Sequence, residues 1–348
     1  MTEKPPLSSG GFFFSSEQTL KPLIPANYGV FASARGGSLA ELSPDRQRGV
    51  SRSSSQRQPW SVYVHDLIDQ AGGLVTTSQL TAVMSRKMLA THVRTGDIVR
   101  VCHGVYARTP PDVMGTLAAL DLMVGQPLVA CMGTAAWLYG FDTERDGRVH
   151  VLDPAVRLRP TTGVMVHQRA GAPLRRVQGR LTTAPAWTAV EVARTLRRPR
   201  ALATLDAALH VGACTVAELE AAVHEQKGRR GIVVVREMLS YADGRAESPM
   251  ESEARLVFID HGLPRPELQF EIVDHCGDLW RADFAWVDAK VVAEYDSMGW
   301  HANPQAWKRD RIKAERLRDC GYTTVPIVVD DVRRQPYELA SRIRRLVT

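Results

Sequence analysis

The chain has 348 residues, of which 44% are hydrophobic and 24% are charged, and its formal net charge is +6. This composition is typical of a globular protein with two or three domains, and it permits a polyanionic partner without requiring one. Its five cysteines are scattered, and no apolar run is long enough to span a bilayer, so we expect a cytoplasmic protein without a disulfide framework, a thiolate zinc site or a membrane partner.

Residues 1–59 are rich in Ser, Gly, Pro and Arg and lack a sustained apolar period, so we predict a disordered basic tail. Such a tail is either dispensable, or an over-extended start of the reading frame, or a basic arm that strengthens nucleic-acid binding. Short basic runs such as 51–57 are weak signals, so the first two interpretations are favoured over the third.

Residues 60–110 are predicted to form a winged helix-turn-helix. Apolar residues recur at helical spacing over 64–71, a second helix can be capped by Thr77 and Ser78, and a third runs from Ser85 to Gly96. Two short runs, 98–101 and 105–107, then predict a β-hairpin that forms the wing. The third helix would enter a major groove with a basic outer face made of Arg86, Lys87, His92 and Arg94. This fold also serves protein contacts, and the basic face favours nucleic acid.

Three segments of this region carry a recognisable pattern. They are 66–73, Ser85-Arg-Lys-Met-Leu-Ala-Thr-His-Val-Arg-Thr-Gly96 and Val99-Arg-Val-Cys-His-Gly-Val-Tyr-Ala107. Together they resemble the N-terminal domain of AbiEi-type antitoxins over about fifty residues, chiefly through the Gly-Val-Tyr-Ala wing. The resemblance implies a winged helix that binds DNA at the system's own promoter, and a possible toxin partner.

Residues 111–245 are predicted to mix helices and strands. Helical spacing covers 114–124, 130–139, 187–196, 201–210 and 216–223, and alternation predicts strands at 148–152 and 163–167. This region resembles the α/β region that follows the winged helix in AbiEi-like proteins. We interpret His150 and His167 as ordinary strand residues, because no Asp, Glu or Cys accompanies them at ligand spacing. The region is therefore expected to be scaffold or a partner surface.

Residues 246–348 are predicted to have the element order αβββαβα. The first helix has Ser248 as its N-cap, Pro249 at its first position and Glu251 closing a capping box, and it ends at Gly262. Strands at 268–273, 279–287 and 290–296, a helix over 303–321, a strand at 322–329 and a last helix to 347 follow. Pro326 indicates that the last strand is an edge strand or has a bulge.

Three carboxylates lie in neighbouring apolar runs of this region. Glu294 and Asp296 would point to the same face of a strand, and Asp283 joins them if the two runs pair. A group of this kind is costly unless a divalent cation such as Mg²⁺ or Mn²⁺ occupies it. Asp283 and Glu294 could instead be strand-end carboxylates that pair with Arg281 or Lys290.

Two glutamates of the first helix, Glu251 and Glu253, could also reach such a site. Periodicity alone favours plainer roles for both. Glu251 would cap the helix, and Glu253 would be a solvated residue.

The same region carries ordered motifs at compatible spacing. They are Ser248-Pro-Met-Glu-Ser252, Gly262-Leu-Pro-Arg-Pro266, Arg281-Ala-Asp-Phe284, Glu294-Tyr-Asp-Ser-Met-Gly-Trp-His301 and Arg309-Asp-Arg311 with Leu317 and Gly321. They resemble the very-short-patch-repair-like branch of the PD-(D/E)XK nuclease superfamily over about a hundred residues. The resemblance implies a restriction-endonuclease-like core.

The resemblance also implies roles for single residues. Asp283 and Glu294, with Glu251, would hold the metal ion, and His301 would act as general base or orient the attacking water. Asp296 stands where many superfamily members have a catalytic lysine, and Ser297 replaces the usual glycine after it. The following helix could hold backbone phosphates with Arg309, Arg311 or Lys313.

The sequence thus predicts a metal-dependent DNA endonuclease with a winged-helix DNA-binding domain. The alternative is a non-catalytic DNA-binding antitoxin or transcriptional repressor of a type IV toxin–antitoxin-like system, in which the nuclease fold has become a structural module. A nuclease that acts on RNA is a third possibility.

Overall fold

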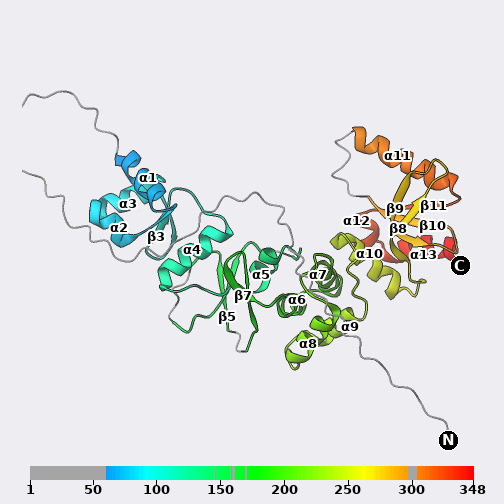
Figure 1. Ribbon diagram of the computed structural model, residues 1–348, viewed down its shortest axis with the longest axis horizontal. Coiled ribbons are helices and arrows are strands. Elements are labelled where there is room, and N and C mark those ends of the chain that lie inside the picture. The colour runs from blue at the N-terminus through cyan, green and yellow to red at the C-terminus, as the bar shows by residue number, and fades with distance from the viewer. Residues whose placement is uncertain (1–59, 145, 157, 159–160, 169–170, 297–303) are drawn as a thin grey trace, which may run out of the picture. The chain divides into compact units, whose positions relative to one another are not determined.

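The computed structural model describes residues 60–348 except 145, 157, 159–160, 169–170 and 297–303 (Figure 1). The predicted tail at 1–59, Ser297 and His301 therefore lie outside the described residues. No helix in the described part of the chain is both long and apolar enough to cross a membrane.

The first folded region contains the predicted helices and hairpin. Its elements are α1 (Trp60–Gln70), β1 (Leu74–Thr76), α2 (Thr77–Val83), α3 (Arg86–Thr95), β2 (Val99–Cys102) and β3 (Val105–Ala107). The strand β1 was not predicted, and it pairs with β3 to give the sheet order β1-β3-β2. The cap of α2 is Thr76 rather than Thr77 or Ser78, and it forms a capping box with Gln79.

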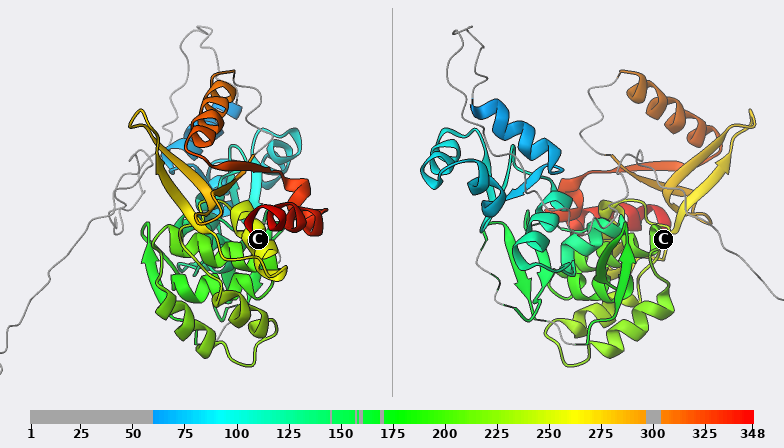
Figure 2. Two further views of the ribbon diagram at one scale, coloured as in Figure 1. Left: turned by 90° about the vertical axis from the view of Figure 1, so that its right-hand side faces the viewer. Right: turned by 60° about the vertical axis from the view of Figure 1, so that its left-hand side comes forward.

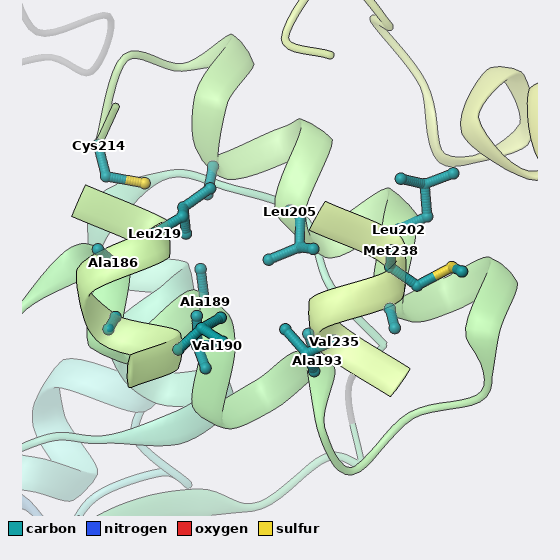
Figure 3. Close-up of a cluster of buried hydrophobic side chains, with 14 of the residues drawn as sticks. Ala186, Ala189, Val190, Ala193, Leu202, Leu205, Cys214, Leu219, Val235 and Met238 are labelled. Atoms are coloured by element: carbon teal, nitrogen blue, oxygen red, sulfur yellow. The ribbon is translucent and has the colours of Figure 1, made fainter. Parts of the chain in front are cut away.

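The middle region combines short strands with a helical layer. Its elements are α4 (Val113–Val124), α5 (Met132–Tyr139), β4 (Val149–Leu152), β5 (Val164–His167), β6 (Leu174–Val177), β7 (Arg180–Thr183), α6 (Pro185–Ala193), α7 (Arg198–His210), α8 (Val216–Glu225) and α9 (Ile232–Leu239). The strands β4 and β5 are parallel, whereas β6 and β7 form an antiparallel hairpin. Figure 3 shows the core between α6 and α9, to which Val190, Leu205 and Val235 contribute.

The last region contains one four-stranded sheet between helices. Its elements are α10 (Pro249–Asp260), β8 (Glu267–Val273), β9 (Leu279–Trp286), β10 (Val291–Tyr295), α11 (Pro304–Asp319), β11 (Thr323–Ile327), α12 (Val329–Arg333) and α13 (Pro336–Val347). The sheet order is β11-β10-β9-β8, with β11 parallel to β10 and the other pairs antiparallel. One face packs on α10 and α13 and the other on α11, as Figure 1 and Figure 2 show. Except for the added α12, the elements follow the predicted order, and Pro326 lies in the edge strand β11.

Ion pairs join α7 of the middle region to α10 of the last region. Arg198 Nη1 lies 2.9 Å from Asp260 Oδ2, Arg200 Nη1 lies 3.3 Å from Glu253 Oε1, and Arg255 pairs with Asp206. We call these six residues the α7–α10 seam. Leu256 of α10 also belongs to the hydrophobic core formed by α6 to α9. The predicted domain boundary near residue 245 is thus crossed by a packed helix pair.

The α7–α10 seam corrects the prediction for Glu253. Its side chain is buried and accepts hydrogen bonds from Arg333 Nε and Nη2, both at 2.8 Å. The prediction of a solvated residue is therefore wrong, because Arg333 comes from a helix eighty residues further along the chain, which periodicity cannot reveal.

Candidate functional site

The exposed face of α3 carries the predicted basic residues Arg86, Lys87 and Arg94. The helix is fixed at its start by Ser85, whose hydroxyl accepts a hydrogen bond from the Met88 N–H at 3.2 Å. It ends where the cap residue takes the left-handed conformation, at Gly96. Two of the three basic side chains lie in the first turn, which is the part of a recognition helix that reaches base edges.

His92 does not lie on this basic face as predicted. Its Nδ1 lies 3.0 Å from Asp97 Oδ2, and the imidazole is mostly buried. Hydrogen bonds from Thr95 and His92 lower the pKa of the Asp97 carboxyl. The side chain of His92 is therefore part of the joint between α3 and the wing.

The wing is tied to the start of α2. The carbonyl of Gly104, at the hairpin turn, accepts a hydrogen bond from the Thr77 N–H at 2.8 Å. Gly104 has a φ of 78°, a conformation that favours glycine. Next to the turn, Arg100 Nη2 lies 2.8 Å from His103 Nδ1, and both side chains are exposed. The wing therefore presents a basic side chain in a fixed orientation relative to the helices.

The second candidate site lies on the α11 face of the large sheet. Asp283 of β9 and Glu294 of β10 are on this face, because residues two positions away, Ala285 and Val292, pack in the same cluster as a leucine of α11. The Tyr295 N–H donates to Asp283 Oδ2 at 2.8 Å. The predicted pairing of the two apolar runs is therefore correct, and it brings both carboxylates to one face.

Glu251 approaches this site from α10. Its Oε2 accepts hydrogen bonds from Gln269 Nε2 at 2.8 Å and from the Glu247 N–H at 3.0 Å. Ser248 caps the helix as predicted, with its hydroxyl accepting from the Glu251 N–H. The Glu251 carboxylate, however, binds Glu247 rather than closing the predicted capping box, so it is directed towards the sheet. Gln269 has a φ of 51°, a strained value for a residue other than glycine.

Lys313, one of the predicted phosphate-binding residues of α11, lies at the carboxylate site. Its Nζ lies 2.7 Å from Glu294 Oε1, whereas Arg309 and Arg311 of the same helix are exposed. The sequence contains an indication of this position, because Lys313 lies one helical turn before the buried Leu317 and so shares the side of α11 that faces the sheet. The structure thus places an ammonium group beside the carboxylates, although Asp296 stands at the position where the resemblance would have a lysine.

Burial is the main electrostatic influence on the two acids Asp283 and Glu251. Burial raises the pKa of Asp283, against the opposing effects of the Tyr295 N–H and the Lys313 charge. Burial also raises the pKa of Glu251, and the nearby Asp283 adds to that rise. Two carboxyl groups with raised pKa values and one lysine are therefore gathered in one place, which is common at functional sites.

The remaining predicted residues are less tightly gathered. Asp296 follows β10 directly and is exposed, with its N–H donating to the Ile327 carbonyl at 2.8 Å. His301 lies outside the described residues. Among the described residues, no three His, Cys, Asp or Glu side chains form a cluster that could hold a metal ion.

The two predicted strand histidines have partners that the sequence did not suggest. His150 Nε2 lies 2.9 Å from Asp146 Oδ1, and His150 Nδ1 lies 2.8 Å from His167 Nε2. Both histidines lie in strands as predicted, in β4 and β5, and the acidic neighbour of His150 is the one feature that the spacing did not indicate. Asp146 lies in the loop before β4, and the parallel pairing of β4 with β5 supplies His167.

Comparison with known proteins identifies the first two regions. Residues 63–109 match the family model described as transcriptional regulator, AbiEi antitoxin, and residues 128–241 match the one described as AbiEi antitoxin C-terminal domain. Two Mycobacterium tuberculosis proteins, the uncharacterized proteins Rv2248 and MT2308, are each 63% identical to this chain over 262 residues. The aligned segment is 75% of this chain and 97% of each relative. The family models thus cover the winged helix and the middle region.

Proposed function

This chain belongs to the family of the two Mycobacterium tuberculosis proteins and contains AbiEi antitoxin domains, and from that premise we propose that it is a DNA-binding transcriptional regulator of the antitoxin type. The observation that carries the proposal is the exposed basic face of α3, made of Arg86, Lys87 and Arg94. The first two would reach base edges in a major groove, and the third would contact phosphate. Arg100 of the wing would contact the backbone beside the groove.

The expected operator lies upstream of the protein's own gene, as the antitoxin resemblance implies. Binding should be measured by fluorescence anisotropy with a duplex from that region and with a scrambled duplex of equal length. Replacing Arg86 and Lys87 together by Ala should weaken specific binding roughly tenfold or more, because each direct contact contributes on the order of 1–3 kcal/mol.

The matched control is Arg236→Ala, which removes an exposed arginine from α9, outside the winged helix. It should leave the affinity for both duplexes unchanged. Equal binding by the Arg86/Lys87 double variant and the wild type would contradict the proposal.

A toxin partner is part of the same proposal. The antitoxin resemblance implies a paired toxin, and we expect the middle region, which matches the antitoxin C-terminal domain, to contact it. Copurification of this protein with the product of an adjacent gene tests the pairing directly. A negative result there, with DNA binding intact, would leave a repressor without a toxin.

A second candidate function is phosphodiester hydrolysis at the carboxylate site, and the position of Lys313 is the observation that favours it. Asp283, Glu294 and an ammonium group on one face would together recognise a phosphate and a hard cation. Carboxylate oxygens are the donor type that Mg²⁺ or Mn²⁺ prefers, so Asp283 and Glu294 would hold such an ion, and Glu251 would have to release Gln269 to complete the site. A bound ion would supply Lewis acidity, while Lys313 would hold a phosphate oxygen and His301 would accept a proton.

Cleavage of double-stranded DNA, single-stranded DNA and RNA with Mg²⁺ or Mn²⁺ tests this second function. Asp283→Asn and Lys313→Met should each abolish cleavage, whereas Asp278→Asn, which changes an exposed residue in the β8–β9 turn, should not. If no nucleic acid is cut, or if Asp283→Asn cuts normally, the C-terminal region is a structural module. DNA binding through α3 should be the same in either case.

A further inference from the structure

The turn of the wing carries a histidine that the proposed DNA contacts do not include. His103 lies between β2 and β3, directly before Gly104, and its side chain is exposed. The carbonyl of Gly104 accepts hydrogen bonds from the N–H of Thr77 at 2.8 Å and from its hydroxyl at 3.3 Å, so the turn is tied to the start of α2. The imidazole therefore stands at the tip of the wing, on the same turn as the basic side chain of Arg100.

His103 accepts a hydrogen bond from the arginine of the wing. Arg100 Nη2 lies 2.8 Å from His103 Nδ1, and Arg100 Nε donates to the Cys102 carbonyl at 3.4 Å. A guanidinium group has only donors, so Nδ1 is the acceptor and the imidazole is the neutral tautomer with its hydrogen on Nε2. Nδ1 can therefore gain a proton only when this bond breaks, because the bond uses the same lone pair.

The titratable neighbours of His103 on β2 keep one charge state near neutral pH. Arg100 remains a cation at any pH that the folded protein tolerates. Burial raises the pKa of the Cys102 thiol to about 11, although the charge of Arg100 opposes that rise. The thiol points inward, and its Sγ donates to the Ala119 carbonyl of α4 at 3.3 Å. Of these groups, His103 is the one whose charge changes near neutral pH.

A DNA phosphate beside the wing would change both partners of this hydrogen bond. It accepts from Arg100 more strongly than a neutral imidazole does, because the bond then joins opposite charges. The guanidinium consequently leaves Nδ1, and the lone pair of Nδ1 takes a proton from the solvent. The resulting imidazolium has an N–H donor on each ring nitrogen and a positive charge that favours a second phosphate. One bond to a neutral ring within the protein is thus exchanged for two charge-assisted bonds to DNA.

We propose that His103 is a second cationic contact of the wing with the DNA backbone, which forms when DNA binding is accompanied by the uptake of one proton. The proposal rests on the DNA binding proposed above and adds its regulation, because it makes the affinity for DNA depend on pH. Arg86 and Lys87 of α3 are charged throughout the neutral range and give no such dependence.

The affinity of the full chain for the operator duplex and for the scrambled duplex should be measured by fluorescence anisotropy at about pH 6 and about pH 8. The wild type should bind roughly three- to tenfold more tightly at the lower pH, because a histidine ordinarily titrates near about pH 6.5. Both duplexes should respond, since a phosphate contact carries no sequence information. The dependence of log affinity on log salt concentration should also be steeper at the lower pH, by up to about 0.9 for one added phosphate contact.

Two substitutions fix the two charge states of the wing turn. His103→Gln keeps an acceptor for Arg100 but cannot take up a proton, so it should lose the gain in affinity at the lower pH. His103→Lys carries a permanent charge, so its affinity should be the same at both pH values. The matched control His224→Gln, which removes an exposed histidine from α8, should keep the full pH dependence. Calorimetric titration in two buffers of different ionisation enthalpy should show proton uptake by the wild type and none by His103→Gln.

Equal affinity of the wild type at both pH values would overturn the proposal. So would a pH dependence that His103→Gln retains, since the proton would then enter another group, such as His65 or His92. If His103→Gln does not fold, His103→Lys decides, because a pH dependence that it retains would have the same meaning. A wild type that binds neither duplex at either pH would overturn the proposed DNA binding as well, so the two failures give different results.

Discussion

Single residues matter most where charge is buried. Asp206 is 1% exposed, and it accepts hydrogen bonds from the Asp243 N–H at 2.8 Å and from Arg255. Burial raises the pKa of Asp206, and the charge of Arg255 works against that rise. Arg255 also donates to the Tyr241 carbonyl, so it joins α10 to two parts of the middle region. A buried charge is tolerated only because its partner is present.

Arg255→Met should therefore destabilise the protein by about 3–5 kcal/mol, because it leaves a buried carboxylate unpaired. The double variant with Asp206→Leu should recover a substantial part of this loss, since both charges are then gone. Urea unfolding of the two variants and of the wild type measures the difference. An Arg255→Met variant as stable as the wild type would show that the pair is not structural.

The loop acid Asp146 gives a pH dependence with a definite sign. Its pKa is about 2 in the folded protein against 3.8 normally, so its contribution to stability is complete above about pH 4 and is lost as the pH falls towards 2. The difference in melting temperature between the wild type and Asp146→Asn should thus be largest near neutral pH and shrink below pH 4. Asp142→Asn, at an exposed position in the same loop, should show a smaller difference at neutral pH. A constant difference across this range would contradict the assignment.

At the scale of helices and strands, the sequence predicted most elements whose pattern is local. The three helices of the winged region, the wing and the order αβββαβα follow from periodicity and caps. The helix α9 was missed because its run of β-branched residues favours a strand. It is helical because Ile232, Val235 and Met238 pack into a core made by distant helices, while Val233 is 70% exposed.

At the candidate sites, the sequence predicted only those neighbours that follow from the residue pattern within single strands or helices. Asp283 and Glu294 share a face because strands alternate, and this needed only the pairing of two neighbouring runs. The contact of His150 with His167 could not be found this way, because the parallel pairing of β4 with β5 is not encoded in either strand. The contact of Lys313 with Glu294 likewise depends on which face α11 covers.

The cap of α3 gives a prediction at this scale. Ser85→Ala removes the side-chain acceptor for the Met88 N–H and should cost roughly 1 kcal/mol, the usual value for an N-cap. Thr91→Ala, in the exposed middle of the same helix, should have a smaller effect. Thermal unfolding of both variants tests this, and equal losses would mean that the cap is not the cause.

For the whole molecule, the α7–α10 seam means that the packed core of the middle region continues past residue 241, where the second family match ends. Residue 241 closes the second match, yet α10 begins only eight residues later and buries Leu256 in the core of the helices before it. The seam also pairs Arg198 and Arg200 of α7 with acids of α10, although Arg198 has a second partner in Glu237 of α9.

A chain that ends after residue 245 should consequently be much less stable than the full chain. It loses the partner of the buried Asp206 and exposes an apolar side of α7. Size-exclusion chromatography and thermal unfolding should show aggregation or a strongly lowered melting temperature. A shortened chain that stays monomeric and as stable as the full chain would contradict this.

The seam also constrains how such a chain can change over evolutionary time. A recombination event that joined this middle region to a different C-terminal partner would have to bring a helix with an acid, a base and an acid at the positions of Glu253, Arg255 and Asp260. A helix without these charges would leave Arg200 without its partner in α10 and the buried carboxylate of Asp206 without a counter-charge. The two regions are therefore expected to be inherited together.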